Sequence, residues 1–414
     1  MATDTPDFCA EPRTLTLESA LEHLIARIDP ITESETVALK PARGRILALA
    51  PASPLDLPPF ANSAMDGYAL RAEDSGPQAA LAVIGTAWAG QPFTGAVGPG
   101  QCVRIFTGAV LPEGADAVVM QEYVIRVDET IRLAAAMKPG ANIRPQGGEI
   151  QAGQALLPQG KRLEAADLGL LAAAGLAEVP VLRRIKVAIL STGDELRPVG
   201  ETLAPGQIHD SNRYLLDALL AELGADILDF GTVADDPEAL RRVLLAAAAQ
   251  ADAIVSTGGA SVGEADFVVE VLRDIGQFEF WKVAIKPGKP FAYGRIGAAH
   301  CFGLPGNPVA VAVTFRQLVR PALTRLQGEP PRPPLRLPAR CETRLRKKPG
   351  RMEFQRGRYR RGPDGTFIVA AGAGQGSDRL SSLSLANCYI VLPADNTGVE
   401  PGGGVEIEPF DAFL

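Results

Sequence analysis

Histidine and cysteine are too few and too dispersed in this chain to form a zinc site of the usual spacing. The 414 residues contain three histidines and five cysteines, and no two of the cysteines form a Cys-x-x-Cys pair. An odd number of widely separated cysteines also argues against a disulfide framework and fits a reducing compartment. We therefore expect neither a structural zinc ion nor a fold stabilised by disulfides.

Long apolar runs are also missing. No stretch approaches the roughly 18 apolar residues of a membrane span, and the first residues show no basic start followed by an apolar segment, so we expect no signal peptide. The net charge of −7 disfavours a general nucleic-acid binder. There is no Gly-x-x-x-x-Gly-Lys-Ser/Thr phosphate loop either. The expectation is a soluble, cytoplasmic protein that binds neither membranes nor nucleic acid.

The length of the chain predicts two to four domains. Strands and helices alternate from 185 to 326, which is typical of an α/β domain. The stretch from 81 to 133 reads as short strands with frequent Gly and Pro, which indicates a small β domain. Five prolines between 330 and 338 predict a stiff, extended linker. The sequence after this linker is strand-like to its end and predicts a C-terminal β domain.

One stretch of the predicted α/β domain stands out as a ligand site. The apolar run Ala253–Ser256 reads as a buried strand and is followed by Thr257-Gly258-Gly259. A strand, a glycine-rich turn and the start of a helix form a seat for an oxyanion. Ser261, Glu264 and Asp266 follow before the helix. Because carboxylates repel a bare phosphate, they suit a phosphate that arrives with a divalent cation.

A second strand ends in the same way. The apolar run from 185 to 190 leads into Ser191-Thr192-Gly193, with Asp194-Glu195 after it. Ligands of open α/β sheets bind at the carboxyl ends of the strands. We therefore expect Ser191, Thr192 and Gly193 to form one wall of a crevice, and Ser256, Thr257, Gly258, Gly259 and Ser261 to form the other. The alternative is that both are ordinary turns, in which Ser, Thr and Gly are common.

Two further features of the α/β domain carry charge. Asp236-Pro237 begins a helix in the ordinary way, with Asp as cap and Pro in the first turn, which leaves Asp235 without a structural explanation. In the predicted strand 278–287, the period of two places Lys282 and Lys286 on one face and the apolar residues on the other. We favour a cleft over open solvent for these lysines.

Two stretches outside that domain are also candidates. Asp66 lies among small polar residues at the end of an extended proline-rich segment, where the alternative is a plain Asx turn at Asp66-Gly67. Residues 340–361 contain ten Lys and Arg against Glu342 and Glu353. This run contrasts with the acidic remainder of the chain. It is either a solvated face, the usual interpretation, or a surface that approaches an anionic ligand or an acidic partner.

Taken together, these motifs resemble one family, the molybdopterin molybdenumtransferases that include MoeA and the E domain of gephyrin. The resemblance extends over nearly the whole chain and rests on six stretches in the same order: Asn62–Tyr68, Arg104–Gly108, Ser191–Leu196, Ala253–Phe267, Lys286–Pro290 and Leu304–Pro308. One departure is the loop Arg144–Glu149, where the family often has more arginines and ends in Glu-Asp.

The resemblance implies a multidomain α/β plus β fold. Its parts would be a central three-layer α/β domain resembling the molybdopterin-binding fold (181–328), a β-rich lid domain (53–144), an elongated linking domain (1–52 and 145–180) and a C-terminal β-barrel-like domain (329–414). It also implies a homodimer, with each active site between the α/β domain of one subunit and the lid of the other.

The resemblance further implies the activity: molybdate is inserted into adenylylated molybdopterin and AMP is released with Mg²⁺ present. The adenylyltransferase that makes this substrate is a further expected partner. By position, Asp66, Thr107, Glu195, Asp235 and Asp266 would be catalytic, and Glu195, Asp235 and Asp266 would hold the metal. Substrate-binding residues carried over in the same way, or from the motifs above, are Lys282, Lys286, Lys289, Pro305, Pro308, Arg356 and Ser377.

Two alternatives remain from the sequence. The first is the adenylyltransferase itself, whose α/β fold is similar; that enzyme is typically the α/β domain alone, whereas here about 180 residues precede it. The second is a scaffold that has kept the fold without the activity. A scaffold could lose its carboxylates, but Asp66, Glu195, Asp235 and Asp266 are all present.

Overall fold

The computed structural model describes residues 13–258 and 267–410 of the protein. The chain forms two compact units, one of Met1–Glu33 and Leu182–Leu414 and the other of Ser34–Val181. Within the described residues, the stretch before Ser34 thus belongs to the first unit. The division into four domains at the boundaries given above remains a prediction.

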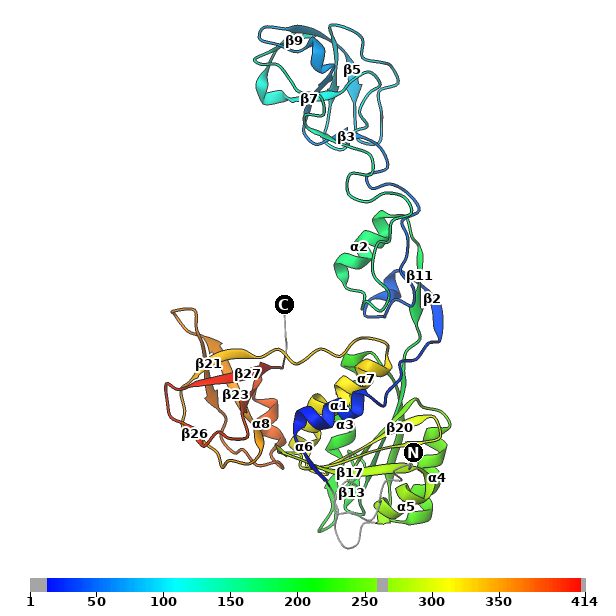
Figure 1. The fold of residues 1–414 in the computed structure, drawn as a ribbon, viewed down its shortest axis with the longest axis vertical. Coiled ribbons are helices and arrows are strands. Elements are labelled where there is room, and N and C mark those ends of the chain that lie inside the picture. The colour runs from blue at the N-terminus through cyan, green and yellow to red at the C-terminus, as the bar shows by residue number, and fades with distance from the viewer. Residues whose placement is uncertain (1–12, 259–266, 411–414) are drawn as a thin grey trace, which may run out of the picture. The chain divides into compact units, whose positions relative to one another are not determined.

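A seven-stranded sheet organises the first unit (Figure 1), in the order β1-β17-β19-β20-β16-β12-β15. The four strands β20, β16, β12 and β15 are parallel, whereas β19 runs antiparallel to both of its neighbours. The strands are β1 (Arg13–Leu15), β12 (Lys186–Thr192), β15 (Asp226–Val233), β16 (Ala253–Thr257), β17 (Gln277–Val283), β19 (Pro290–Ile296) and β20 (Ala299–Leu304).

Helices cover both faces of this sheet and complete three layers (Figure 1). One apolar core joins a face of the sheet to α1 (Leu17–Ile25), α3 (Ser211–Leu223), α6 (Pro308–Thr314), the π-helical η4 (Phe315–Val319) and α7 (Arg320–Leu326). The other core joins the opposite face to α4 (Pro237–Ala248) and α5 (Phe267–Ile275). No helix within 13–258 or 267–410 is both long and apolar enough to cross a membrane.

The helices begin where the sequence places their caps. Thr16 accepts a hydrogen bond from the backbone N–H of Ser19, and Asp210 accepts one from that of Arg213. Asp236 accepts from Glu238 and Ala239, with Pro237 in the first turn of α4. Since Asp236 meets the needs of this helix, Asp235 remains free for another role.

The prediction of one continuous strand over 278–287 is wrong, because the structure has two strands there. Strand β17 ends at Val283, and β18 (Ile285–Lys286) pairs instead with β23 (Met352–Arg361) of the C-terminal domain. Ala284 is the crossing point: its N–H donates to Leu15 O at 2.8 Å, and its carbonyl accepts from Met352 N at 2.9 Å. Burial still alternates along this stretch, but Lys282 and Lys286 belong to two different sheets.

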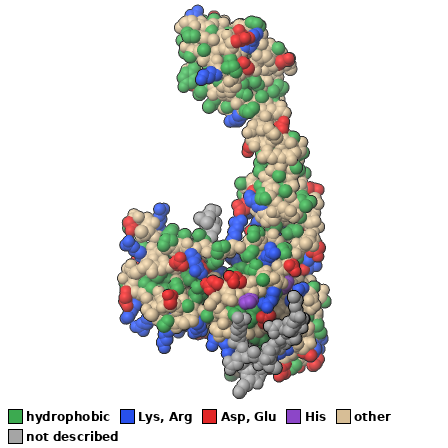
Figure 2. All heavy atoms as spheres, in the orientation of Figure 1, with side chains coloured by type: hydrophobic (Ala, Val, Ile, Leu, Met, Phe, Trp, Pro, Cys, Tyr) green, Lys and Arg blue, Asp and Glu red, His purple; other side chains and the backbone are tan. Residues whose placement is uncertain are grey.

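The C-terminal domain is a closed barrel of five strands, because β23 pairs with both β24 and β25. Its strands are β21 (Leu337–Cys341), β23 (Met352–Arg361), β24 (Phe367–Ala371), β25 (Cys388–Leu392) and β27 (Gly404–Pro409), with the short pair β22 (Leu345–Arg346) and β26 (Gly398–Val399) and one helix, α8 (Leu380–Ser384). Figure 2 shows Lys and Arg side chains spread over the surface of this barrel.

The second unit contains the lid, a six-stranded sheet in the order β7-β4-β6-β5-β9-β8. Its strands are β4 (Gly67–Leu70), β5 (Ala80–Ala87), β6 (Gln101–Ile105), β7 (Ala117–Met120), β8 (Val124–Val127) and β9 (Thr130–Leu133). Both faces of the sheet are packed: Tyr68 and Leu70 point into one core, and Ala69 points into the other.

The rest of this unit is smaller. A third core surrounds α2 (Ala165–Ala173). The short elements are β2 (Ser34–Ala38), paired with β11 (Glu178–Leu182), and β3 (Asn62–Ser63), paired with β10 (Ile143–Arg144), together with the 3₁₀ turns η1 (Lys40–Ala42), η2 (Ala72–Asp74) and η3 (Gln121–Tyr123). In the first unit, β13 (Leu196–Arg197) pairs with β14 (Ile208–His209).

A charged clamp at the amino ends of the parallel strands leads to a testable prediction. Arg183 donates two hydrogen bonds to Asp252, at 2.7 and 2.8 Å, and Lys186 N–H donates a third at 2.7 Å. Burial raises the pKa of the Asp252 carboxyl, but the bonds from Arg183 and Lys186 outweigh burial and bring the pKa below its usual value. The carboxylate therefore stabilises the fold above the unfolded-state pKa, and this contribution is lost as the pH falls through the lower folded-state pKa.

We expect Asp252→Asn to lower stability at pH 7 by about 1–2 kcal/mol, allowing for partial exposure of the pair. The difference from the unaltered protein should shrink as the pH falls below about 4. Thermal unfolding between pH 3 and 7 measures it. The matched control is Asp274→Asn, which removes the partner of Arg241 in an exposed pair and should change little at any pH. A pH-independent loss for Asp252→Asn would contradict the linkage.

Candidate functional site

The two Ser-Thr-Gly turns lie side by side at the carboxyl ends of β12 and β16. Ser191 is the register partner of Thr257, and their hydroxyl oxygens are 3.0 Å apart. Thr192 Oγ1 donates to Thr257 O at 3.3 Å. The Ser191 and Thr257 side chains are almost fully buried. The structure thus brings the two predicted walls together, and these hydroxyl groups hold the strand ends to each other.

Glycine is required where the turns meet. Gly258 has φ of +100°, and a Cβ there would lie 2.5 Å from the backbone oxygen of Thr192. Its N–H donates to Leu304 O at 3.3 Å, which ties the end of the third parallel strand, β20, to the same place. Ser256 is half-buried in β16. Gly259, Ser261 and Asp266 lie outside the described residues.

Carboxylates gather beside these turns. The backbone N–H of Asp235 donates to Asp194 Oδ1 at 3.1 Å, and a Cβ at Gly193 would lie 2.5 Å from Glu195 Oε2. Burial raises the pKa of the Asp235 carboxyl above its usual value; the negative charges of Asp194 and Glu195 raise it further, against a lowering by a hydrogen bond with the Asp194 backbone. In the part of the chain that the structure describes, no three His, Cys, Asp or Glu side chains are arranged to hold a metal ion.

The loop from Pro305 to Pro308 leads from strand β20 into helix α6 and is hydrogen-bonded to the C-terminal domain. Asn307 precedes α6, and Pro308 occupies its first turn. Asn307 Nδ2 donates to Ser377 Oγ at 2.9 Å, and Val309 N–H donates to Ser377 O at 3.0 Å. The C-terminal domain therefore places Ser377 directly against this loop.

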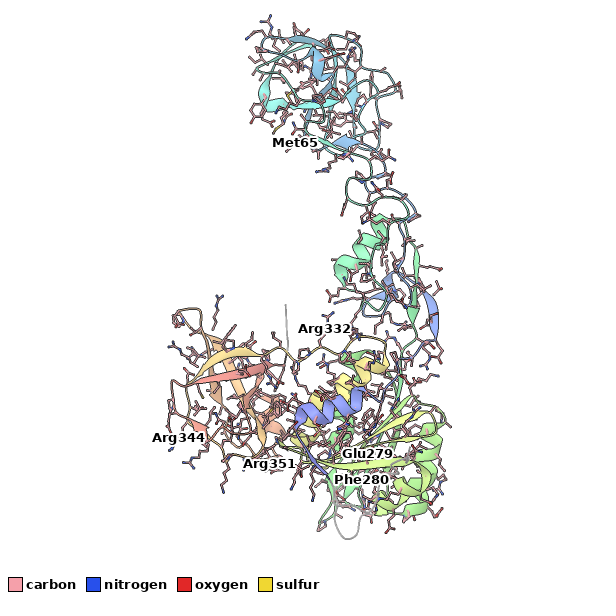
Figure 3. The ribbon with its side chains drawn as sticks, viewed as in Figure 1. Met65, Glu279, Phe280, Arg332, Arg344 and Arg351 are labelled. Carbon is pink, nitrogen blue, oxygen red and sulfur yellow. The ribbon has the colours of Figure 1, made fainter. Side chains whose placement is uncertain are left out.

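A cavity of about 590 Å³ opens where the α/β domain borders the barrel. Predicted site residues in its lining are Gly258, Lys286, Lys289, Pro305, Arg356 and Ser377. Lys282 and Pro308 do not line it. Arg351, labelled in Figure 3, comes from the barrel side of this border. The lining thus joins three exposed cations, Lys286, Lys289 and Arg351, to the glycine turn at the end of β16.

A buried carboxylate fixes one of these cations. Lys286 Nζ lies 3.1 Å from Glu353 Oε1 on β23, and the side chain of Glu353 is 7% exposed whereas that of Lys286 is 50% exposed. Gln355 Nε2 also donates to Glu353 Oε1, at 3.1 Å. Glu353 therefore holds the ammonium group of Lys286 against the barrel, and the same lysine side chain lines the cavity.

Arg356 is placed differently from what its carried-over role suggests. Its side chain is almost fully buried, and burial lowers the pKa of its guanidinium. Nε donates to Ser382 Oγ at 3.1 Å, and Nη2 donates to the carbonyls of Gly374 and Gly376 at 3.1 and 2.8 Å. These bonds hold the loop that carries Ser377. The role of Arg356 as a substrate ligand remains a prediction.

Asp66 and Thr107 meet in the lid although they are 41 residues apart. The N–H and the hydroxyl of Thr107 both donate to Asp66 Oδ1, at 2.8 and 2.7 Å. The backbone N–H of Thr107 is the main cause of a lowered Asp66 pKa, and its hydroxyl adds to the effect. The Asx-turn alternative is not what the structure shows, because Gly67 begins strand β4 and the carboxylate bonds to Thr107 instead.

Three residues near the site were not singled out from the sequence. Asp194 accepts from Asp235, Arg351 lines the cavity, and Asn212 Nδ2 donates to Gly306 O at 2.7 Å. Asn212 follows the cap Asp210 in the first turn of α3. Because Asp210 already caps this helix, the side chain of Asn212 was left without a structural explanation, as Asp235 was beside the cap Asp236. Arg351 belongs to the basic run 340–361, whose net charge does not show which of its residues line the cavity.

Three family models cover most of the chain. Residues 15–175 match the MoeA N-terminal region, described as domains I and II. Residues 188–325 match a probable molybdopterin binding domain. Residues 338–410 match the MoeA C-terminal region, described as domain IV. The three matches follow one another in the order of the MoeA regions.

Relatives match over nearly their full length. A Molybdopterin molybdenumtransferase of Haemophilus influenzae is 43% identical over 402 residues, which are 97% of this chain and 100% of the relative. One from Nostoc is 39% identical over 394 residues, 92% of this chain and 90% of the relative. Among solved structures, the molybdopterin biosynthesis MoeA protein of Pyrococcus horikoshii is 33% identical, with a TM-score of 0.81, and the match covers 97% of this chain and 100% of that one.

Proposed function

The chain belongs to the MoeA family of molybdopterin molybdenumtransferases, and from this premise we propose that its 590 Å³ cavity binds the anionic substrates of the reaction. The protein is an enzyme of molybdenum cofactor biosynthesis that inserts molybdenum. The alternatives of an adenylyltransferase and of an inactive scaffold fall behind this function, because the relatives that match over full length carry the transferase name.

The observation that carries the proposal is the gathering of cations at the cavity. Lys286, Lys289 and Arg351 line it together with Gly258, whose turn follows a strand end. We infer that the substrates are adenylylated molybdopterin, which carries phosphates, and molybdate, which is a dianion. Ammonium, guanidinium and backbone N–H groups are the donors that such oxyanions require. The N–H of Gly258 is already bonded to Leu304 O, so the backbone donors would come from the residues that follow each strand end, Gly193 in the first turn and Gly259 and Ser261 in the second.

The metal would bind at the carboxylate group next to these turns. The raised pKa of Asp235 reflects burial and the uncompensated charges of Asp194 and Glu195, which a cation would relieve. Hard carboxylate oxygens suit Mg²⁺. We propose Glu195 and Asp235, completed by Asp266, as its ligands. When bound, Mg²⁺ would supply positive charge to the phosphate oxygens of the anhydride. The protein's own part is to hold the carboxylates at the strand ends and to position the phosphates against the lysines.

The lid residues Asp66 and Thr107 have no place in the cavity lining. As the resemblance implies, we propose that the active enzyme is a homodimer in which the lid of one subunit completes the site of the other. Asp66, held by Thr107, would then act on the substrate as a fixed carboxylate. We further propose a cytoplasmic enzyme that receives its substrate from the adenylyltransferase.

A direct assay tests the function. The purified protein is mixed with adenylylated molybdopterin, molybdate and Mg²⁺, and both AMP and molybdenum cofactor are measured. We expect equal amounts of the two products, and none of either without molybdate and Mg²⁺. Formation of adenylylated molybdopterin from ATP and molybdopterin, with no molybdenum insertion, would instead identify an adenylyltransferase.

Lys286 is the cation to test first. Replacing it by alanine removes a charge-assisted bond to the substrate, so we expect affinity for molybdopterin to weaken by about 1.5–3 kcal/mol, or roughly 10- to 100-fold. The loss should be smaller at high salt. Calorimetry measures it, and Lys348→Ala, which removes an exposed lysine of the basic run 340–361 outside the lining, is the matched control. Equal affinities for the two variants would contradict the assignment of Lys286.

A further inference from the structure

The lid carries a stack of flat groups that runs from its core to its surface. Tyr68 is 4% exposed, and the guanidinium carbon of Arg104 lies 5.1 Å from the centre of its ring. The same carbon lies 4.6 Å from the centre of the Phe106 ring. Phe106 in turn stacks on Trp88, with centres 4.1 Å apart and planes 8° from parallel. Trp88, the outermost layer, is 49% exposed.

The strands of the lid fix every layer of this stack. Tyr68 on β4 is the register partner of Arg104 on β6. The period of two puts Phe106 on the same side as Arg104. The N–H of Phe106 donates to Ala87 O at 3.3 Å, which brings the end of β5, and Trp88 after it, alongside. Arg104 also donates to Gly67 O at 3.0 Å and to Gln121 Oε1. The indole is therefore held on a rigid support.

A hydrogen-bond acceptor lies beside the stack. Thr107 follows Phe106 directly and donates both of its hydrogen bonds to Asp66 Oδ1. Within the described residues, no hydrogen bond reaches Asp66 Oδ2. The positive charge of Arg104, in the middle of the stack, also contributes to the lowered pKa of Asp66. The lid thus presents an exposed ring surface and a carboxylate oxygen that its own groups leave available.

We propose that the outer face of Trp88 binds a planar nitrogen heterocycle, whose amino or ring N–H groups donate to Asp66. Flat rings stack on an indole in the parallel arrangement already seen between Trp88 and Phe106. Any nucleobase gains stacking energy on an aromatic side chain, because every base has a flat π-face. An aliphatic ligand could donate to the carboxylate but would not stack on the plane of the indole. The proposal rests on the proposed function, in which the substrate carries two such rings, an adenine and a pterin.

The experiment uses the full-length protein and three probes: AMP, a pterin, and ribose 5-phosphate as the matched compound without a base. The two tryptophans give an optical readout, because Trp281 is 5% exposed and Trp88 is the accessible one. We expect AMP or the pterin to quench the fluorescence of the unaltered protein. Because the Trp88 variants lack this indole, calorimetry measures their affinities, and Trp88→Ala should bind the ring about tenfold or more weakly. Trp88→Phe should retain most of the affinity. Tyr123→Ala is the control, an exposed aromatic residue of the same unit outside the stack.

The outcomes show which of the two rings binds, and they separate a wrong ring-binding proposal from a wrong proposed function. A loss for AMP alone assigns the adenine, and a loss for the pterin alone assigns the pterin. Unchanged affinities for both rings in Trp88→Ala, or no binding of either ring to the unaltered protein, overturn the proposal. It is also overturned if Trp88→Ala changes the molecular mass in solution, because the indole would then be a protein contact. If Trp88→Ala still inserts molybdenum with an unchanged KM, the proposed ring-binding role of Trp88 is wrong and the proposed function stands. If the unaltered protein inserts no molybdenum, the proposed function itself is wrong.

Discussion

Two inactive variants, Asp66→Ala and Asp235→Ala, are expected to recover activity when their subunits are exchanged. If each site takes Asp66 from one subunit and Asp235 from the other, a hybrid dimer contains one site with both changes and one site with neither. Random exchange yields about half hybrids, so the mixture should reach roughly one quarter of the activity of the unaltered enzyme. Molybdenum cofactor formation after mixing, refolding and confirmation of exchange by mass measures it.

A second mixture is the control for this experiment. Glu195→Ala and Asp235→Ala both alter the α/β domain, and their side chains influence each other directly. A hybrid of these two has one change in each site, so no intact site forms and no recovery is expected. Recovery in neither mixture, with subunit exchange demonstrated, would place Asp66 and Asp235 of one site in the same subunit. Recovery in both would point to a general effect of mixing.

The neighbouring residues Asp235 and Asp236 should give opposite results when each is replaced by alanine. Asp236 accepts two backbone hydrogen bonds at the start of α4, so Asp236→Ala should lose about 1 kcal/mol of stability and keep its activity. Asp235 makes no such cap, and burial and its acidic neighbours raise its pKa. Asp235→Ala should therefore leave the melting temperature unchanged or slightly higher. Its AMP release should slow by at least about a hundredfold.

Three measurements on this pair decide the role of Asp235: the melting temperature, the affinity for adenylylated molybdopterin, and the rate of AMP release at saturating Mg²⁺. If the carboxylate serves the metal, Asp235→Ala binds the substrate and needs more Mg²⁺ for what activity remains. A marked fall in melting temperature, with AMP release intact at low temperature, would show instead that Asp235 is structural. The Asp236→Ala variant shows what such a structural loss looks like one residue away.

That the two turns lie at the same edge of the sheet was predictable from the sequence for a topological reason. Parallel strands of an α/β sheet all end at one edge, and here the two strands with Ser-Thr-Gly endings are also neighbours. The bond between Ser191 and Thr257 is the result. The cap at Asp236 was predictable from Asp-Pro at the helix start, and the structure has it there; the role of its neighbour Asp235 stays a prediction.

Other parts of the site were beyond the sequence pattern. A period of two shows which side chains share a face, but it does not show whether a strand stays in one sheet; the crossing at Ala284 depends on Met352, far along the chain. The resemblance implied a substrate-binding role for Arg356, which stays a prediction, but it could not show that this side chain is buried and that its Nε and Nη2 donate to Ser382, Gly374 and Gly376. The contact of Asp66 with Thr107 follows from strand pairing in the lid, which local sequence does not specify.

The crossing at Ala284 also bears on whether the α/β domain and the barrel can evolve independently. The proline-rich segment before β21 is a joint at which genetic recombination could exchange one barrel for another. A foreign barrel joined there would have to offer β18 a matching strand edge and offer Lys286 a carboxylate like Glu353. Because both requirements lie in β23 and not in the joint, the α/β domain and the barrel should descend together as one evolutionary module, and substitutions at Lys286 and Glu353 should be linked across related chains.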